Sequence, residues 1–170
     1  MTEPDFFDAL ETVLVREIAG CVNLVRVERL SGGASMETYR LVVRMSEGDT
    51  VLCMRRGAGG IDRESVSAIG LATEALLMRT ARDYGVVEPE VHYVLETKDE
   101  VGVGFIMEWL DGETLGARIV RSEKLDAVRD GLAEQCGREL AKIHAIDVES
   151  LGLKQHLPVL DPSSYLHQTW

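Results

Sequence analysis

The sequence predicts an α+β fold built on a mostly antiparallel sheet. Short segments in which apolar and polar residues alternate are separated by glycine-containing or acidic turns, which is typical of β-hairpins. Three other segments carry apolar residues at spacings of three and four, which is typical of amphipathic helices. The order of these segments is helix, three strands, helix, two strands, helix. Because strands and helices do not alternate strictly, this order favours an antiparallel sheet over a parallel one.

One helix and three strands are predicted in the first part of the chain. Apolar residues recur at helical spacing from the start of the chain, and Gly20 follows as a stop signal. The next segments are β-branched and alternating, and small or acidic residues separate them. The predicted helix covers residues 5–19, and the predicted strands cover residues 22–30, 39–45 and 51–54.

One helix, two strands and a long final helix are predicted in the remainder. The middle helix ends at Gly85, with Pro89 beyond it, and a turn over residues 98–100 separates the two strands. The final helix has an apolar stripe that includes Leu132 and Leu140, and an irregular tail follows from Leu151. The predicted bounds are 65–84 for the middle helix, 91–95 and 103–107 for the strands, and 124–146 for the final helix.

Charge and composition exclude several classes of partner. The chain of 170 residues has 18 basic and 29 acidic residues, and its net charge of -11 would repel nucleic acid and anionic membranes. The acidic start is unlike a secretory signal, and no apolar run approaches the roughly 20 residues that span a bilayer, so we expect a cytoplasmic protein. Three separated cysteines, Cys21, Cys53 and Cys136, predict small buried side chains rather than disulfides or a zinc site.

A glycine turn joins the first two predicted strands at Ser31, Gly32, Gly33, Ala34 and Ser35. Rossmann and Walker loops open a helix, whereas a strand follows here. A hairpin of this form covers nucleotide phosphates in protein-kinase-like folds. Taken alone, the turn is more typical of a purely structural hairpin.

A cation and a carboxylate follow in the order that a kinase uses. Arg55 lies on the third predicted strand, in phase with Cys53, and Glu74 lies at the edge of the apolar stripe on the next helix. Kinases pair a cation on this strand with an acid on this helix to grip the α- and β-phosphates. The alternative is that both side chains are simply solvated.

The last predicted strand leads into an acidic, glycine-containing turn. Residues 105–107 are apolar, and Glu108, Trp109 and Leu110 begin the segment that continues to Leu115. This pattern is typical of a hinge whose backbone could bind the edge of a purine. An ordinary turn at the end of a strand is the alternative.

Together these segments resemble the aminoglycoside phosphotransferase and choline kinase-like family. The resemblance is collinear, covers roughly residues 20 to 150, and is therefore more specific than any one motif. The resembling segments are Leu30 to Tyr39, Met54-Arg55-Arg56, Glu74 to Leu77, Phe105 to Leu115 and Leu140 to His144.

The resemblance implies a protein-kinase-like N-terminal lobe with a five-stranded, mostly antiparallel sheet over residues 1–112. Residues 113–170 would then begin a helical C-terminal lobe. It also implies that Ser31 to Ser35 cover phosphates, that Arg55 occupies the usual lysine position with Glu74 as its partner, and that Glu108 to Leu110 contact adenine. Arginine in the lysine position departs from the antibiotic-modifying enzymes and leaves the acceptor open. A one-residue shift of the strand would put Arg56 in the place of Arg55.

The family's catalytic loop is not found in this sequence. It would need His-x-Asp with an asparagine five residues beyond, but none of the four histidines has Asp at that spacing, and the only asparagine is Asn23. His144 is expected to be a packing residue. The implied parent is a small-molecule kinase using ATP or GTP with Mg²⁺ and a hydroxyl acceptor, and this chain alone is expected to be inactive, as a fragment that ends before the catalytic loop. The alternative is a non-catalytic nucleotide-binding or protein-interaction module, and an exposed helical surface could also support self-association.

Overall fold

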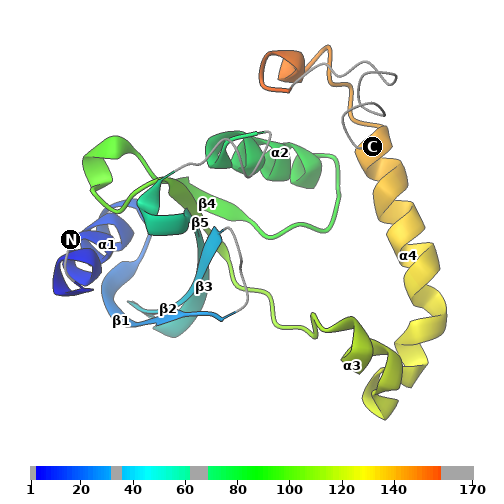
Figure 1. The fold of residues 1–170 in the computed structure, drawn as a ribbon, viewed down its shortest axis with the longest axis horizontal. Coiled ribbons are helices and arrows are strands. Elements are labelled where there is room, and N and C mark those ends of the chain that lie inside the picture. The colour runs from blue at the N-terminus through cyan, green and yellow to red at the C-terminus, as the bar shows by residue number, and fades with distance from the viewer. Residues whose placement is uncertain (1–2, 32–35, 62–68, 158–170) are drawn as a thin grey trace.

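A computed structural model describes residues 3–31, 36–61 and 69–157 of the chain. The described residues form an α+β fold with a five-stranded antiparallel sheet, as the sequence predicts. One helix lies on each face of the sheet, and a long connection leads from the sheet to a helical segment that extends away from it (Figure 1).

The sheet has the strand order β1-β2-β3-β5-β4. The first three strands form consecutive hairpins, and β2 and β3 pair in unbroken register from Met36 opposite Gly57 to Met45 opposite Gly48. Gly48 has a φ of 135°, which a residue with a side chain rarely adopts, and this explains the glycine in the tight turn. The strand bounds are β1 Cys21–Arg29, β2 Met36–Met45, β3 Gly48–Gly57, β4 Val91–Val94 and β5 Gly104–Glu108.

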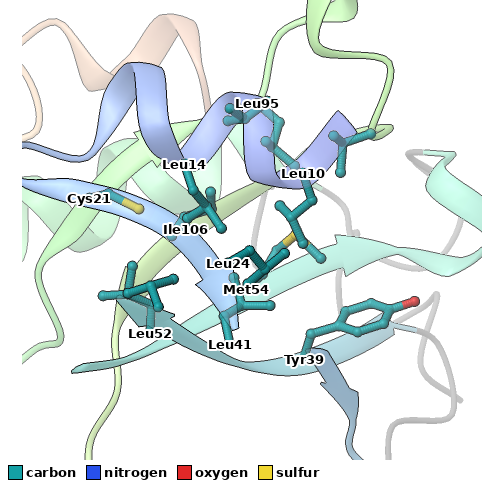
Figure 2. Packing of buried hydrophobic residues seen from close by; sticks show 13 residues of the cluster. Leu10, Leu14, Cys21, Leu24, Tyr39, Leu41, Leu52, Met54, Leu95 and Ile106 are labelled. Carbon is teal, nitrogen blue, oxygen red and sulfur yellow. The ribbon is translucent and has the colours of Figure 1, made fainter. Parts of the chain in front are cut away.

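Helix α1 (Glu3–Glu17) covers one face of the sheet and forms the main core. Leu10 and Leu14 point from α1 toward side chains of the sheet such as Leu41 and Ile106 (Figure 2). The strict alternation of buried and partly exposed residues along β2 places every second side chain in this core.

Helix α2 (Leu71–Asp83) packs on the opposite face against β4 and β5. Its buried residues Leu71 and Ala75 contact Val91 and Phe105 in a second, smaller apolar cluster. The sequence predicts a helix from residue 65, but the described helix begins after Gly70, whose extended backbone caps it. Residues 62–68 lie outside the described ranges.

The helical segment after the sheet consists of α3 (Gly116–Arg121) and α4 (Asp126–His144), with a short 3-10 helix, η3 (Glu123–Leu125), between them. Helix α3 is not predicted from the sequence. Neither α3 nor α4 has a buried residue. Three further 3-10 helices are η1 (Ala58–Gly60), η2 (Thr97–Asp99) and η4 (Leu153–Gln155).

Three expectations about single residues were wrong. Cys136 is exposed on α4, although Cys21 and Cys53 are buried as expected. His144 is exposed at the end of α4 instead of packing. Leu153 lies in the segment expected to be an irregular tail, but it begins a 3-10 helix and is buried, bordering a hollow of about 310 Å³ whose other wall includes Met78 of α2. No helix in the described ranges is long and apolar enough to cross a bilayer.

Candidate functional site

The two arginines at the end of β3 point to opposite faces of the sheet. Arg56 lies on the α1 face, where its guanidinium is 4.9 Å from the centre of the Phe6 ring. Arg55, the next residue along a pleated strand, lies on the α2 face. The alternative in which Arg56 takes the place of Arg55 therefore does not fit this register.

Arg55 and Glu74 meet across the interface between β3 and α2. Arg55 Nε lies 3.3 Å from Glu74 Oε1, and both side chains retain partial exposure. The Nε atom itself is buried, yet within the described part of the chain it makes no hydrogen bond, because this close contact lacks hydrogen-bond geometry. The guanidinium is held near the carboxylate by charge and keeps a donor unsatisfied.

A row of side chains beside Arg55 lies on the same α2 face. Arg40 of β2 is opposite Cys53 of β3, which is in turn opposite Met107 of β5, and directly opposed residues point to the same face. The Arg40 guanidinium carbon lies 5.6 Å from the centre of the Trp109 ring. The sheet thus presents two cations, a buried thiol and an aromatic ring on this face.

The segment predicted to be a hinge leaves the sheet at Glu108, the last residue of β5. The Glu108 amide donates to the Glu90 carbonyl at 2.8 Å, and the Glu90 amide donates to Glu108 Oε2 at 3.2 Å. Arg82, near the end of α2, lies 3.8 Å from the same carboxylate oxygen. Glu108 is therefore tied by its backbone and by its side chain to the start of β4.

Trp109 and Leu110 differ from Glu108. Trp109 Nε1 donates to Asp111 at 2.8 Å, and the Leu110 side chain is exposed. Outside the strand ladders, no backbone hydrogen bond joins Trp109 or Leu110 to another described residue. The backbone of this segment could therefore bind a ligand with donors and acceptors along one edge.

The predicted phosphate-covering turn is described at one residue only. Ser31 lies in an exposed turn directly after β1, while Gly32, Gly33, Ala34 and Ser35 lie outside the described residues. The strands on either side are fixed close together, because the Leu30 amide donates to the Thr38 carbonyl at 2.8 Å.

A buried carboxylate next to this turn was missed by the sequence analysis. Glu37 is only 7% exposed and accepts hydrogen bonds from Arg56, Tyr39 and the Gly59 amide. Burial alone would raise the pKa of Glu37, but these donors outweigh burial and hold its pKa below the ordinary value. The available signal was its phase, since Glu37 alternates with Tyr39 and Leu41 on the face that is buried.

The described residues contain no group of three or more His, Cys, Asp or Glu side chains that could hold a metal ion. The sequence also has no asparagine after Asn23, so the metal-binding asparagine that the resemblance implies has no counterpart here. No step of the chemistry is therefore assigned to a metal held by these residues.

The described residues form a five-stranded antiparallel sheet with a helix against β4 and β5 and a helical segment after β5. This is the α+β arrangement of a kinase-like N-terminal lobe joined to a helix. The sequence model of the phosphotransferase enzyme family matches residues 26–169, which include most of the sheet and all of α4. The chain belongs to this family. No curated protein matches it.

Proposed function

We propose that this chain is the nucleotide-binding part of a phosphotransferase that transfers the γ-phosphoryl group of ATP or GTP to a hydroxyl group of a small molecule. The family provides the reaction class, and the resemblance provides the nucleotide and the acceptor class. We further propose a cytoplasmic location and no nucleic-acid partner, in keeping with the net charge of -11. Residues 1–112 would bind nucleotide, and residues 113–170 would begin the helical lobe.

The observation that supports this proposal best is the Arg55–Glu74 pair. Its Nε to Oε1 distance of 3.3 Å places a guanidinium with an unsatisfied donor on the face of the sheet opposite α1. A phosphate oxygen could accept hydrogen bonds from this guanidinium while Glu74 keeps it in place. The pair thus joins β3 to α2 and leaves one donor of the guanidinium unsatisfied.

The hinge supports the base-binding half of the proposed site. The backbone groups of Trp109 and Leu110 would contact the edge of the purine, and Glu108 would fix the segment through its bonds to Glu90. Residues 31–35 would cover the phosphates. When bound with nucleotide, Mg²⁺ would neutralise phosphate charge, although the described residues contain no group of three or more side chains that could hold it.

Weak nucleotide binding by the chain tests this function. Without a metal site, three or four phosphate charges meet one or two arginines in a protein of net charge -11, so we expect dissociation constants near the millimolar range (about 4 kcal/mol of binding). Adenosine should bind almost as well as ATP, and Mg²⁺ should add little. Titrations followed through the amide NMR signals of residues 31–35, 55 and 108–110 would measure both ligands.

Two charge variants provide the matched control. Arg55→Gln should weaken ATP binding and leave adenosine unchanged, because Arg55 is placed to contact phosphate. Arg44→Gln removes the same charge from an exposed pair with Asp49 at the far end of β2, and should change neither ligand substantially. The absence of saturable binding of either nucleotide or nucleoside would overturn the proposed function. Micromolar, Mg²⁺-dependent binding would show that a complete metal site exists in this chain.

Turnover separates the enzyme from a non-catalytic module. The 170 residues alone should show no phosphoryl transfer above background, since they lack the His-x-Asp and asparagine pattern. In a protein that also supplies these groups, Glu74→Gln should lower turnover by well over about tenfold with little change in stability. An unchanged rate would show that Arg55 and Glu74 form only a surface ion pair. A complete absence of turnover in that protein would favour the non-catalytic binding module.

A further inference from the structure

Glu37 is a meeting point for four separate elements. Its carboxylate accepts hydrogen bonds from Arg56 Nη1 at 2.7 Å and from the Tyr39 hydroxyl at 3.0 Å. It also receives the Gly59 amide at 3.3 Å, and Arg29 Nη2 lies 3.2 Å from Oε1. These groups come from β1, β2, β3 and η1, so one buried carboxylate holds the ends of three strands and the 3-10 helix together.

The place of this cluster in the chain is specific. Arg29 is the last residue of β1 and Glu37 is the second residue of β2, so the carboxylate fixes the two strand ends that flank residues 31–35. Its partner Arg56 directly follows Arg55, and Arg56 Nε also donates to the Val101 carbonyl at 2.6 Å. The same cluster therefore fixes the backbone of the strand that carries Arg55.

Glu37 and Arg56 cannot touch a ligand bound beside Arg55. Both lie on the α1 face, where Phe6 covers the guanidinium, whereas Arg55 and Glu74 lie on the α2 face. Any influence on the ligand must pass through the backbones of β2 and β3. Gly60 and Gly102 leave room for Arg56 here, because a Cβ at Gly60 would come within 2.6 Å of Arg56 Nη2.

We infer that the Glu37–Arg56 pair is a positioning pair that fixes Arg55 and the strand ends around residues 31–35 for binding the phosphates of a nucleotide. This inference rests on the proposed function and adds to it a pair of residues that do not contact the ligand. It assigns the pair to the phosphate half of the site and not to the base half, because the hinge at Glu108 is held separately by Glu90.

The sign of the effect on ATP binding separates positioning from simple electrostatics. Glu37→Gln removes one negative charge near the phosphates, so a purely electrostatic role would make ATP bind more tightly. Loss of positioning would make ATP bind more weakly. Arg56→Lys keeps the positive charge but removes the planar guanidinium whose Nε and Nη1 donate to the Val101 carbonyl and to Glu37. A purely electrostatic role would therefore leave the affinity for ATP unchanged in this variant.

The experiment compares ATP and adenosine binding to the whole chain by NMR titration. For Glu37→Gln and Arg56→Lys we expect the dissociation constant of ATP to rise roughly threefold or more, with that of adenosine unchanged within about twofold. Tyr39→Phe removes one hydrogen bond to Glu37 but keeps the ring beside Phe6, so it should fold normally and show a smaller change in the same direction.

A second buried carboxylate supplies the matched control. Asp99 is 4% exposed and is held by Arg16, by the Tyr93 hydroxyl and by the Glu96 amide, none of which binds Glu37. Asp99→Asn should destabilise the chain without changing the ratio of ATP to adenosine affinity. Three results would overturn the inference and leave the proposed function intact. They are tighter ATP binding by Glu37→Gln, unchanged ATP binding by Glu37→Gln and Arg56→Lys, and an equal loss of affinity for ATP and adenosine. If the parent chain bound neither ATP nor adenosine, the inference and the proposed function would both be overturned.

Discussion

The sheet with α1 and α2 and the segment that contains α3 and α4 are held together by different forces. In the described chain, every buried hydrophobic residue except Leu153 lies between Leu10 and Ile106. Neither α3 nor α4 buries any residue, although α4 is the longest helix. The sheet half is therefore stabilised by a packed core, and α4 depends on local interactions.

Three ion pairs along α4 join side chains of the same helix, and hydrogen bonds of Lys142 and Glu139 attach its last turns to the loop after α2. Arg129 pairs with Asp126, Arg138 with Glu134, and Lys142 with Glu139, at spacings of three or four residues. Such exposed pairs contribute only about 0.3–0.5 kcal/mol each. A regular helical pattern in the sequence thus predicts that a helix forms, but it does not predict whether a packed core or local side-chain pairs stabilise that helix.

Hydrogen exchange should show the largest contrast between the two parts. Amides of β3, at the centre of the sheet, should open only with global unfolding, whereas amides of residues 128–136 of α4 should open locally. We expect the β3 amides to be protected about ten-thousandfold more strongly than those of α4. Comparable protection would mean that α4 is covered in solution, for example by a second copy of the chain, and the dependence of exchange on protein concentration would reveal this.

Truncation of a core side chain should affect the whole sheet half. Phe105 is fully buried at the contact between β5 and α2, and Phe105→Ala should lower the free energy of unfolding by about 3–5 kcal/mol. Urea denaturation followed by far-ultraviolet circular dichroism would measure the loss. Val120→Ala on α3, where the side chain is 68% exposed, is the control and should change stability by less than about 0.5 kcal/mol.

The buried carboxylates make the sheet half sensitive to acid. Burial opposes ionisation of Glu37 and Asp99, but their hydrogen bonds and arginine partners prevail and lower both pKa values. Each carboxylate therefore contributes stability above its ordinary pKa, and this contribution is lost as the pH falls through the lowered value. Glu37→Gln should lower the free energy of unfolding by about 2–3 kcal/mol at pH 7. The difference in stability between parent and variant should shrink progressively as the pH falls below 4.5, the ordinary pKa of a glutamate. A gap that is constant from pH 7 to pH 3 would contradict this account.

Substitution on the apolar stripe of α4 should have the smallest effect. Leu140 is about half exposed, so Leu140→Gln should change the unfolding free energy of the sheet half by no more than about 0.5 kcal/mol. Thermal unfolding of parent and variant would measure this. A larger loss would show that Leu140 is buried against a partner in solution.

The sequence predicted the elements whose pattern is set locally. The five strands and three long helices were found because alternation and helical spacing are properties of neighbouring residues, and Arg55 was placed on the correct face by its phase with Cys53. The pairing with Glu74 was predicted from order along the chain, and its geometry agrees. Its role in binding phosphate remains a prediction.

The sequence could not predict contacts that join distant parts of the chain. Asp99 was assigned to a plain turn, yet it is buried because Arg16, 83 residues away, and Tyr93 come to it. Glu37 was read as part of the glycine-turn signature, and its partner Arg56 was considered only as a rival of Arg55. In both cases a charged residue is buried because its partners arrive through the tertiary fold, which periodicity does not reveal.

The attachment of α4 to the rest of the chain has a mechanical consequence. Lys142 donates to the Gly85 carbonyl at 2.7 Å and Glu139 accepts from the Val87 amide at 3.0 Å, both in the loop that directly follows α2. The preceding part of the helix, roughly 20 Å long, extends beyond these two contacts. A displacement of the last turns of α4 would therefore act first on the end of α2, the helix that carries Glu74.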